Sequence, residues 1–368
     1  MTSADNNQVL ILGSGTLAQE LATSFLRLGF IPRVGSLAQG IPPRGTGEAV
    51  PALTVVCEAA PTEQLAELEQ STGTELVPTV AACEITRNRE GIRRTAAEEH
   101  GLPTMAYEFA DTPEELRTFA ERVGYPCVVK PGTSTGGEGQ SVVTDPAELD
   151  EAWDKAAATG QEGRVAVERY VDFDYECTIL TVRSIDPATG QLATWFCEPI
   201  GTRHEDGRLV EAWQPAPLSA DAMDNARSIA ARISGAIGVQ GIYAIDLFVD
   251  GDEVYFSQVS PRPTLDGMIT GATQRINEFD LHARAVLGLP IDVTLTSPGA
   301  ARFVGAGKVS RESLAEALAV AETGVVVVGD TVVVRSTGED IAEARERAGE
   351  AAARLGGGSA RLDSAQIL

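Results

Sequence analysis

The stretch IYAIDLFVDGDEVYFSQVSPRP, residues 242–263, constrains the fold more than any other part of the sequence. Two apolar runs flank the turn Asp250-Gly-Asp252, a pattern that predicts two strands joined by a tight hairpin. Asp246 and Gln258 fall at matching depths on the two strands. Mg²⁺ prefers hard oxygen ligands, usually one or two carboxylates together with phosphates. Because one of the two side chains is an amide, three interpretations stay open: a working metal site, a weakened metal site, or a plain hairpin.

The N-terminal segment predicts a strand, a glycine-rich turn and an amphipathic helix. Residues 8–30 read QVLILGSGTLAQELATSFLRLGF, and Gly13, Gly15 and Ala18 give the spacing G-x-G-x-x-A. A dinucleotide site would also need an acidic residue about 20 positions later. The sequence there is IPRVGS and has none, so a structural turn is favoured over NAD binding. A third interpretation is that the helix N-terminus faces an anionic substrate group.

The order of elements predicts an α/β fold with more than one domain. The 368 residues are too many for one compact core, so two or three domains are expected. Strands and helices alternate between about residues 104 and 290. The tail, 291–368, contains the hairpin pattern VVVVGDTVVVRS and the helical pattern IAEARERAGEAAARLG, and we expect it to form a small separate lobe.

Composition and charge exclude several classes of partner. The net charge of −24 argues against nucleic acid or an anionic membrane, because both would repel the protein. No apolar run reaches the roughly 20 residues of a membrane helix, and the N-terminus has no signal-peptide pattern. The five cysteines form no metal-binding or paired spacing. These features predict a cytoplasmic protein with reduced thiols.

The segment KPGTSTGGEGQ, residues 130–140, is the strongest candidate for phosphate binding. A lysine ends a strand, and the loop after it is rich in glycine, serine and threonine, so its backbone N–H groups could approach a polyphosphate. It lacks the P-loop pattern, and a flexible surface hairpin is the alternative. Glu168 and Glu176 follow on later strands and could bind an adenine or a ribose, or be ordinary exposed acids.

Several motifs in this order resemble the ATP-grasp superfamily, and within it the formate-dependent glycinamide ribonucleotide transformylases. The motifs that carry the resemblance are NREGIRR (88–94), GYPCVVKP (124–131), FDYE (173–176), EDG (205–207), WQP (213–215), VSPRP (259–263), GM (267–268) and the EFDLHARAVLGLP segment (278–290). They cover residues 85–290 densely and the two ends thinly. The resemblance implies an N-terminal Rossmann-like domain at 1–90, an ATP-grasp domain at 91–290 with subdomains of about 91–170 and 171–290, and a C-terminal β-rich lobe at 291–368.

The resemblance also implies a reaction and a set of site residues. ATP would phosphorylate formate, and the amine of glycinamide ribonucleotide would attack the formyl phosphate; a homodimer is possible. Arg262 would clamp an anionic reactant and act with Lys130 in catalysis, although an arginine between prolines can also be a structural cap. Asp246 and Gln258 would face Mg²⁺, and the substrate side would include Thr16, Leu17, Arg262 and Asp266. The residues implied for ATP are Arg89, Lys130, Thr135, Gly136, Gly137, Glu138, Gly139, Gln140, Glu168, Arg169, Tyr170, Val171 and Glu176.

Some positions depart from the family pattern. The family has lysine where this chain has Glu138, glutamate at Gln258 and glutamate at Thr16. The acid that follows Ser-Pro-Arg-Pro in the family is shifted to Asp266 or lost, and no C-terminal basic cluster is visible. Three hypotheses therefore stay open: a divergent transformylase, an ATP-grasp ligase for another carboxylate and amine, and a weakly active or inactive ATP-binding relative.

Overall fold

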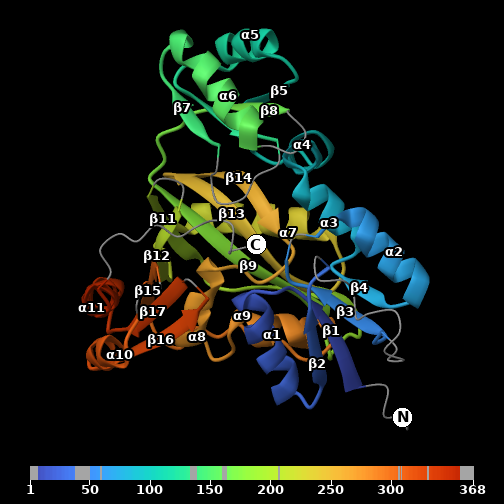
Figure 1. Ribbon diagram of the computed structural model, residues 1–368, viewed down its shortest axis with the longest axis vertical. Helices are drawn as coiled ribbons and strands as arrows, with labels where there is room; N and C mark the ends of the chain where they lie inside the picture. The colour runs from blue at the N-terminus through green and yellow to red at the C-terminus, as the bar shows by residue number, and fades with distance from the viewer. Residues whose placement is uncertain are drawn as a thin grey trace.

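The computed structural model describes residues 7–37, 50–58, 60–132, 139–159, 164–205, 208–305, 307, 309–329 and 331–356. Three β-sheets organise these residues, and helices cover the sheets (Figure 1). The fold is of the α/β class, as the sequence predicts. None of the helices within these ranges is long and apolar enough to cross a bilayer.

The N-terminal sheet is parallel and has the strand order β2-β1-β3-β4. Its elements are β1 (Gln8–Leu12), α1 (Thr16–Arg27), β2 (Ile31–Gly35), β3 (Leu53–Val56), α2 (Thr62–Thr72) and β4 (Glu75–Val77). Residues 9–12 of β1 are almost completely buried, as expected for a central parallel strand that is covered on both faces. Helix α1 packs against α9 (Glu278–Val286), and this contact docks the N-terminal sheet on the rest of the protein.

Two consecutive helices connect the N-terminal sheet to the next part of the chain. The first, α3 (Val80–Arg87), is not predicted from the sequence. Thr79 caps α3 by accepting a hydrogen bond from the N–H of Ala82 at 3.2 Å. The predicted helix start near Asn88 is confirmed: the side chain of Asn88 caps α4 (Arg89–Arg94), which continues into a π-helical turn (Thr95–Glu99).

A small four-stranded sheet follows, with the order β5-β8-β6-β7. It consists of β5 (Tyr107–Ala110), β6 (Cys127–Pro131), β7 (Ser141–Val143) and β8 (Val165–Arg169), and it packs against α5 (Pro113–Val123) and α6 (Leu149–Thr159). Asp145 and Glu148 form a capping box in the 3₁₀ turn before α6, with Pro146 at its first position. The helix that the sequence predicts there is thus confirmed. Lys130 and Glu168 lie on the adjacent strands β6 and β8.

The central sheet has nine strands and runs β14-β13-β9-β11-β12-β15-β17-β16, with β10 paired to β9. Its first strands are β9 (Tyr175–Ile185), β10 (Leu192–Phe196), β11 (Ile200–Glu205), β12 (Arg208–Gln214), β13 (Gly241–Asp250) and β14 (Glu253–Ser260). Helix α7 (Ala220–Ile237) packs on β9, β13 and β14, and α9 packs on β9 and β13. The predicted hairpin is present as β13 and β14, and Asp246 is paired directly with Gln258.

The C-terminal strands continue this same sheet. They are β15 (Gly299–Gly305), β16 (Thr323–Val328) and β17 (Thr331–Thr337), and β15 pairs with β12. The remaining helical elements are a 3₁₀ turn (Asp266–Ile269), α8 (Thr270–Thr273), α10 (Arg311–Leu318) and α11 (Ile341–Arg354). The expected hairpin and helix of the tail are therefore both present, and they stand at the opposite end of the molecule from the small sheet (Figure 1).

One buried carboxylate ties α11 to the central sheet and links two neighbouring strands of that sheet, β12 and β15. Glu211 of β12 is completely buried and accepts hydrogen bonds from Arg345 at 2.8 and 2.9 Å and from Arg203 at 3.0 Å. Arg302 of β15 lies 3.1 Å from it. The guanidinium of Arg345 also stacks 4.6 Å from the ring centre of Trp213. A buried carboxylate is tolerated when cations pair with it in this way.

We expect Glu211→Gln to lower the free energy of unfolding by about 3 kcal/mol, because within the described residues it leaves Arg302 and Arg345 without a charge partner and removes one of the two partners of Arg203. The matched control is Glu205→Gln, which removes an exposed partner of Arg203 and should cost less than about 1 kcal/mol. Urea unfolding of the two variants measures the difference. Equal midpoints would show that the Glu211 cluster does not hold the C-terminal elements in place.

Candidate active site

A buried group of three charged side chains forms one wall of the site. The ammonium of Lys130 lies 2.6 Å from Oε2 of Glu168, and Nη2 of Arg93 lies 2.7 Å from Oε1 of the same carboxylate. Glu168 is 2% exposed. Burial alone would raise the pKa of Glu168, but Arg93, Lys130 and Arg89 together hold this pKa well below its usual value. Glu168 is therefore ionised, and it sits between two cations.

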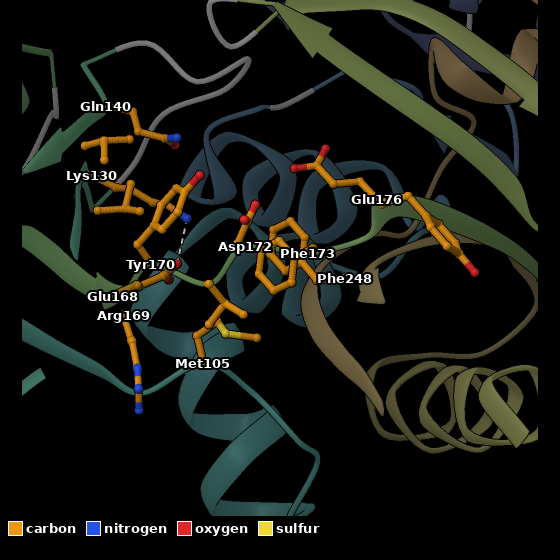
Figure 2. A pocket seen from close by; sticks show the side chains of 14 residues that line it. Met105, Lys130, Gln140, Glu168, Arg169, Tyr170, Asp172, Phe173, Glu176 and Phe248 are labelled. Atoms are coloured by element: carbon orange, nitrogen blue, oxygen red, sulfur yellow. Dashed lines mark hydrogen bonds and ion pairs between the residues drawn. The ribbon is translucent and has the colours of Figure 1, made fainter. Parts of the chain in front are cut away.

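A cavity of about 270 Å³ opens beside Lys130. Its apolar lining includes Phe173 and Phe248, whose rings stack with centres 4.0 Å apart and an angle of 3° between their planes (Figure 2). Its full lining is Met105, Val128, Lys130, Gln140, Val142, Glu168, Arg169, Tyr170, Val171, Asp172, Phe173, Tyr175, Glu176 and Phe248. Apolar walls with a few fixed polar groups are typical of small-molecule sites, and this combination suits a flat base joined to charged groups.

Asp246 and Gln258 form an oxygen-rich pair, here called the oxygen wall, on the hairpin whose strand β13 also carries the cavity residue Phe248. Oδ1 of Asp246 accepts a hydrogen bond from Thr178 at 2.7 Å, and its Oδ2 accepts one from the amide nitrogen of Gln258 at 2.7 Å. Burial and the nearby Asp266 raise the pKa of Asp246 to about 7, and the two hydrogen bonds oppose this rise. Within the described residues, no group of three or more histidine, cysteine, aspartate or glutamate side chains is arranged to hold a metal.

His204 is a site residue that sequence reasoning missed. Its Nδ1 lies 2.8 Å from a carboxylate oxygen of Glu176. Burial would lower the pKa of His204, but the bond to Glu176 and the charges of Asp246 and Asp266 raise it above its usual value. These neighbours favour the protonated form of His204. A signal was available, since the chain has three histidines and this one precedes the EDG motif.

Arg262 faces the junction between the N-terminal sheet and the central sheet without a partner of its own. It makes no hydrogen bond or ion pair with any residue that the structure describes, and it is half-buried near Cys57, Cys83 and Glu58. Burial lowers its pKa. A half-buried cation with no ion pair is better placed to bind an anion than to cap a structural element, so the position favours the clamp over the structural interpretation.

The start of α1, where Thr16 and Leu17 lie, is already occupied by a carboxylate. Oε1 of Glu58 accepts a hydrogen bond from the N–H of Gly15 at 2.7 Å and another from the N–H of Ser14. One interpretation of the sequence makes these N–H groups donors to an anionic substrate group. Because Glu58 already binds them, the structure does not support that interpretation for Ser14 and Gly15. Close by, three buried polar atoms have no partner among the described residues: Thr264 Oγ1, Asp266 Oδ2 and Glu278 Oε1. They mark a polar region where a ligand could bind.

Comparison with known proteins fits this geometry. A family model for the ATP-grasp domain matches residues 95–279. The formate-dependent phosphoribosylglycinamide formyltransferase of Corynebacterium efficiens is 49% identical to this chain, over 96% of each protein. The protein of the same name from Paraburkholderia xenovorans is 42% identical, again over 96% of each. This chain belongs to the ATP-grasp family of formate-dependent phosphoribosylglycinamide formyltransferases.

Solved structures agree with this assignment. The glycinamide-RNase-transformylase T structure from Mycobacterium tuberculosis superposes with a TM-score of 0.79 and 36% identity, covering 95% of this chain and 99% of that one. A carboxyaminoimidazole ribonucleotide synthase from Aspergillus clavatus, complexed with ATP, has a TM-score of 0.81 at 19% identity over 96% and 99% of the two chains. The second match shows that the two proteins share a fold.

The ATP-grasp fold brings many of the predicted nucleotide residues around one cavity. Lys130, Gln140, Glu168, Arg169, Tyr170, Val171 and Glu176 all line it. Arg89 stands beside this wall, where its Nε donates to the carbonyl of Pro131 at 3.2 Å. Gly139 lies one residue from the lining and has a positive φ of 71°. Thr135, Gly136, Gly137 and Glu138 lie outside the described residues.

We expect Lys130→Ala to weaken ATP binding at least about tenfold, because it removes a buried cation and leaves Glu168 facing the nucleotide. Isothermal calorimetry with ATP measures this change. The control is Arg122→Ala, since the Arg122 side chain is 61% exposed and pairs with Glu108 at 2.7 Å, and neither residue lines the cavity. If both variants bind ATP equally well, the cavity beside Lys130 is not the nucleotide site.

We expect Gln258→Glu to tighten magnesium–ATP binding or to raise turnover, since a second carboxylate would face the cation beside Asp246. A magnesium titration at fixed ATP, followed by calorimetry and by phosphate release, measures both quantities. Gln258→Leu removes the amide oxygen and should act in the opposite direction. A Gln258→Glu protein with unchanged affinity and turnover would count against any metal role for this position.

Proposed function

We propose that this chain uses ATP to join formate to the amine of glycinamide ribonucleotide, a step of purine biosynthesis. The observation that carries the proposal is 49% identity over 96% of both chains to a formate-dependent phosphoribosylglycinamide formyltransferase. The close pairing of Lys130 with Glu168 beside the cavity supports it, since catalysis needs the lysine ordered there. Proteins with unrelated activities can share a fold, but this chain also shares nearly half of its residues with the formyltransferase.

The chemistry divides into two transfers. A formate oxygen attacks the γ-phosphorus of ATP, ADP leaves, and formyl phosphate forms. The amine of the ribonucleotide then attacks the formyl carbon, phosphate leaves, and the amine loses a proton. The protein contributes mainly by positioning the reactants and stabilising negative charge. Lys130 is placed to bind phosphate oxygens, and Arg262, which has no ion pair within the described residues, is placed to hold the anionic formate or formyl phosphate.

The oxygen wall fits a magnesium ion that arrives with the nucleotide. Asp246 supplies one carboxylate, and Gln258 can present its amide oxygen after its side chain turns. One carboxylate plus phosphate oxygens is a sufficient set for Mg²⁺ in many phosphate sites. When bound, the ion would neutralise charge on the β- and γ-phosphates. Thr178 keeps the Asp246 carboxylate oriented by its 2.7 Å hydrogen bond.

The domain boundaries, the oligomeric state and the cellular location belong to the same proposal. The boundaries 1–90, 91–290 and 291–368, with a division of the middle domain near residue 170, remain predictions. A homodimer and a cytoplasmic location are likewise inferred from the family and from the composition. The net charge of −24 argues against nucleic acid or an anionic membrane as a partner.

A second candidate is an ATP-grasp ligase that joins another carboxylate to another amine. It is favoured by the substrate side, where Thr16 begins α1 and Glu58 already binds the N–H groups of Ser14 and Gly15. A carboxylate at this position repels an anionic substrate group instead of attracting it. The two candidate functions use the same nucleotide site. They differ in the carboxylate and the amine that bind near Arg262.

Phosphate release from magnesium–ATP, measured with formate, with glycinamide ribonucleotide, with both and with neither, tests the proposal. Release that requires both substrates, together with the N-formyl product in mass spectrometry, is the expected result. ATP binding without release in any of these mixtures would reject the formyl transfer and direct the search to other carboxylate and amine pairs. Arg262→Met should abolish release but leave the affinity for ATP within about threefold, because Arg262 lies away from the nucleotide cavity.

A further inference from the structure

Arg93, on α4, is a buried arginine to which none of the site assignments above gives a role. Its side chain is 2% exposed. Nη2 binds Glu168 at 2.7 Å, and Nη1 donates to the carbonyl of Phe256 at 2.9 Å. Burying a guanidinium costs several kcal/mol unless its donors are well paired. The two bonds lead to different sheets, since Glu168 is on β8 of the small sheet and Phe256 is on β14 of the central sheet.

The bond to Phe256 fixes a β-bulge next to Gln258. Asp246 pairs with Gln258 and Leu247 pairs with Phe256, so Ser257 is an extra residue on β14. A bulge of this kind redirects the side chains beside it. β14 is an edge strand, and the outer edge of Phe256 is held twice: its N–H donates to Pro103 O at 2.8 Å, and its carbonyl accepts from Arg93. The strand is thus pinned two residues before Gln258.

The bond to Glu168 acts on the opposite wall. Glu168 is shared between Arg93 and Lys130, one carboxylate oxygen for each cation. With both cations present, the group keeps a net positive charge that can attract phosphate. Without Arg93, Lys130 and Glu168 would form a neutral pair, and the lysine would be held more strongly by the carboxylate than by a ligand.

We propose that Arg93 is a positioning residue that sets the separation of the two walls of the nucleotide site, the lysine wall at Lys130 and the oxygen wall at Asp246 and Gln258. It is one rigid, planar group with a bond to each sheet. The inference rests on the assignment of this cavity to ATP. It predicts that Arg93 affects both the affinity for the nucleotide and the alignment of its terminal phosphate, although it touches neither.

Three variants separate this role from a purely structural one. Arg93→Met removes both bonds, and Arg93→Lys keeps a charge near Glu168 but offers one ammonium that cannot reach both sheets at once. Arg94→Met is the matched control: Arg94 is the next residue of the same helix, its side chain is 48% exposed, and among the described residues it bonds only to Glu90 and Glu98. Circular dichroism and thermal melting establish that each variant folds.

Affinity is measured by calorimetry with a magnesium complex of a non-hydrolysable ATP analogue, and turnover by phosphate release with both substrates. Arg93→Met should weaken binding at least about tenfold and lower kcat further. Arg93→Lys should bind within about threefold of the native protein and still lose at least about tenfold in kcat, since small misplacements cost that much. Arg94→Met should match the native protein within about twofold in both measurements.

Each outcome decides the question. If Arg93→Lys keeps the native kcat, the bridge between the two walls has no function, and the inference is overturned. If Arg93→Met fails to fold, the kcat of Arg93→Lys decides alone, by the same criterion. If the native protein releases no phosphate, the formyl transfer proposed above fails, but calorimetry still tests Arg93: unchanged affinity in Arg93→Met overturns the inference, and a loss of at least about tenfold supports it.

Discussion

The proposed nucleotide site depends on one buried carboxylate, Glu168. A lone ionised group with 2% exposure would be too costly, and it is stable here because Lys130 and Arg93 each bind one of its oxygens. The dependence is mutual, since neither cation has another charged partner at hydrogen-bond distance within the described chain. Glu168 also stands just before the linker that begins at Tyr170 and leads into the central sheet. The bonds of Glu168 therefore fix both the charged groups of the site and the start of this linker.

The net charge of this protein is negative, whereas the charge beside the cavity is locally positive. The chain carries −24 overall, yet one wall of the cavity gathers Lys130, Arg89 and Arg93 around a single acid. Asp246 and Asp266 form an acidic region of their own, in which Asp266 helps to raise the pKa of Asp246 while His204 and two hydrogen bonds oppose this rise. A triphosphate with its magnesium has the same polarity, because the phosphates are anionic and the ion is cationic. If magnesium–ATP binds between these two groups, as proposed, this distribution of charge favours one orientation of the nucleotide.

Features that depend on local sequence could be predicted. Contacts between residues that are far apart in the sequence could not. The hairpin around Asp246 and Gln258, the helix start at Asn88 and the lysine strand all follow from short-range patterns. Glu58 lies 44 residues from Ser14, and its occupation of the α1 N-terminus can be seen only once the strands are assembled. Arg93 lies inside a motif that carries the resemblance, but its two partners are 75 and 163 residues away. Burial of an arginine is also contrary to its usual preference for the surface.

The amide at Gln258 changes what the oxygen wall does before a ligand arrives. Two facing carboxylates would repel each other in the absence of a cation, and one would have to take up a proton. Here the amide donates a 2.7 Å hydrogen bond to Asp246, so the pair is satisfied without any ion. If this pair binds magnesium, as proposed, the bond would have to break and the amide turn, a cost that the phosphate oxygens would have to offset. The balance favours an ion that enters already bound to the nucleotide over one that binds ahead of it, because only the former brings its own anionic ligands.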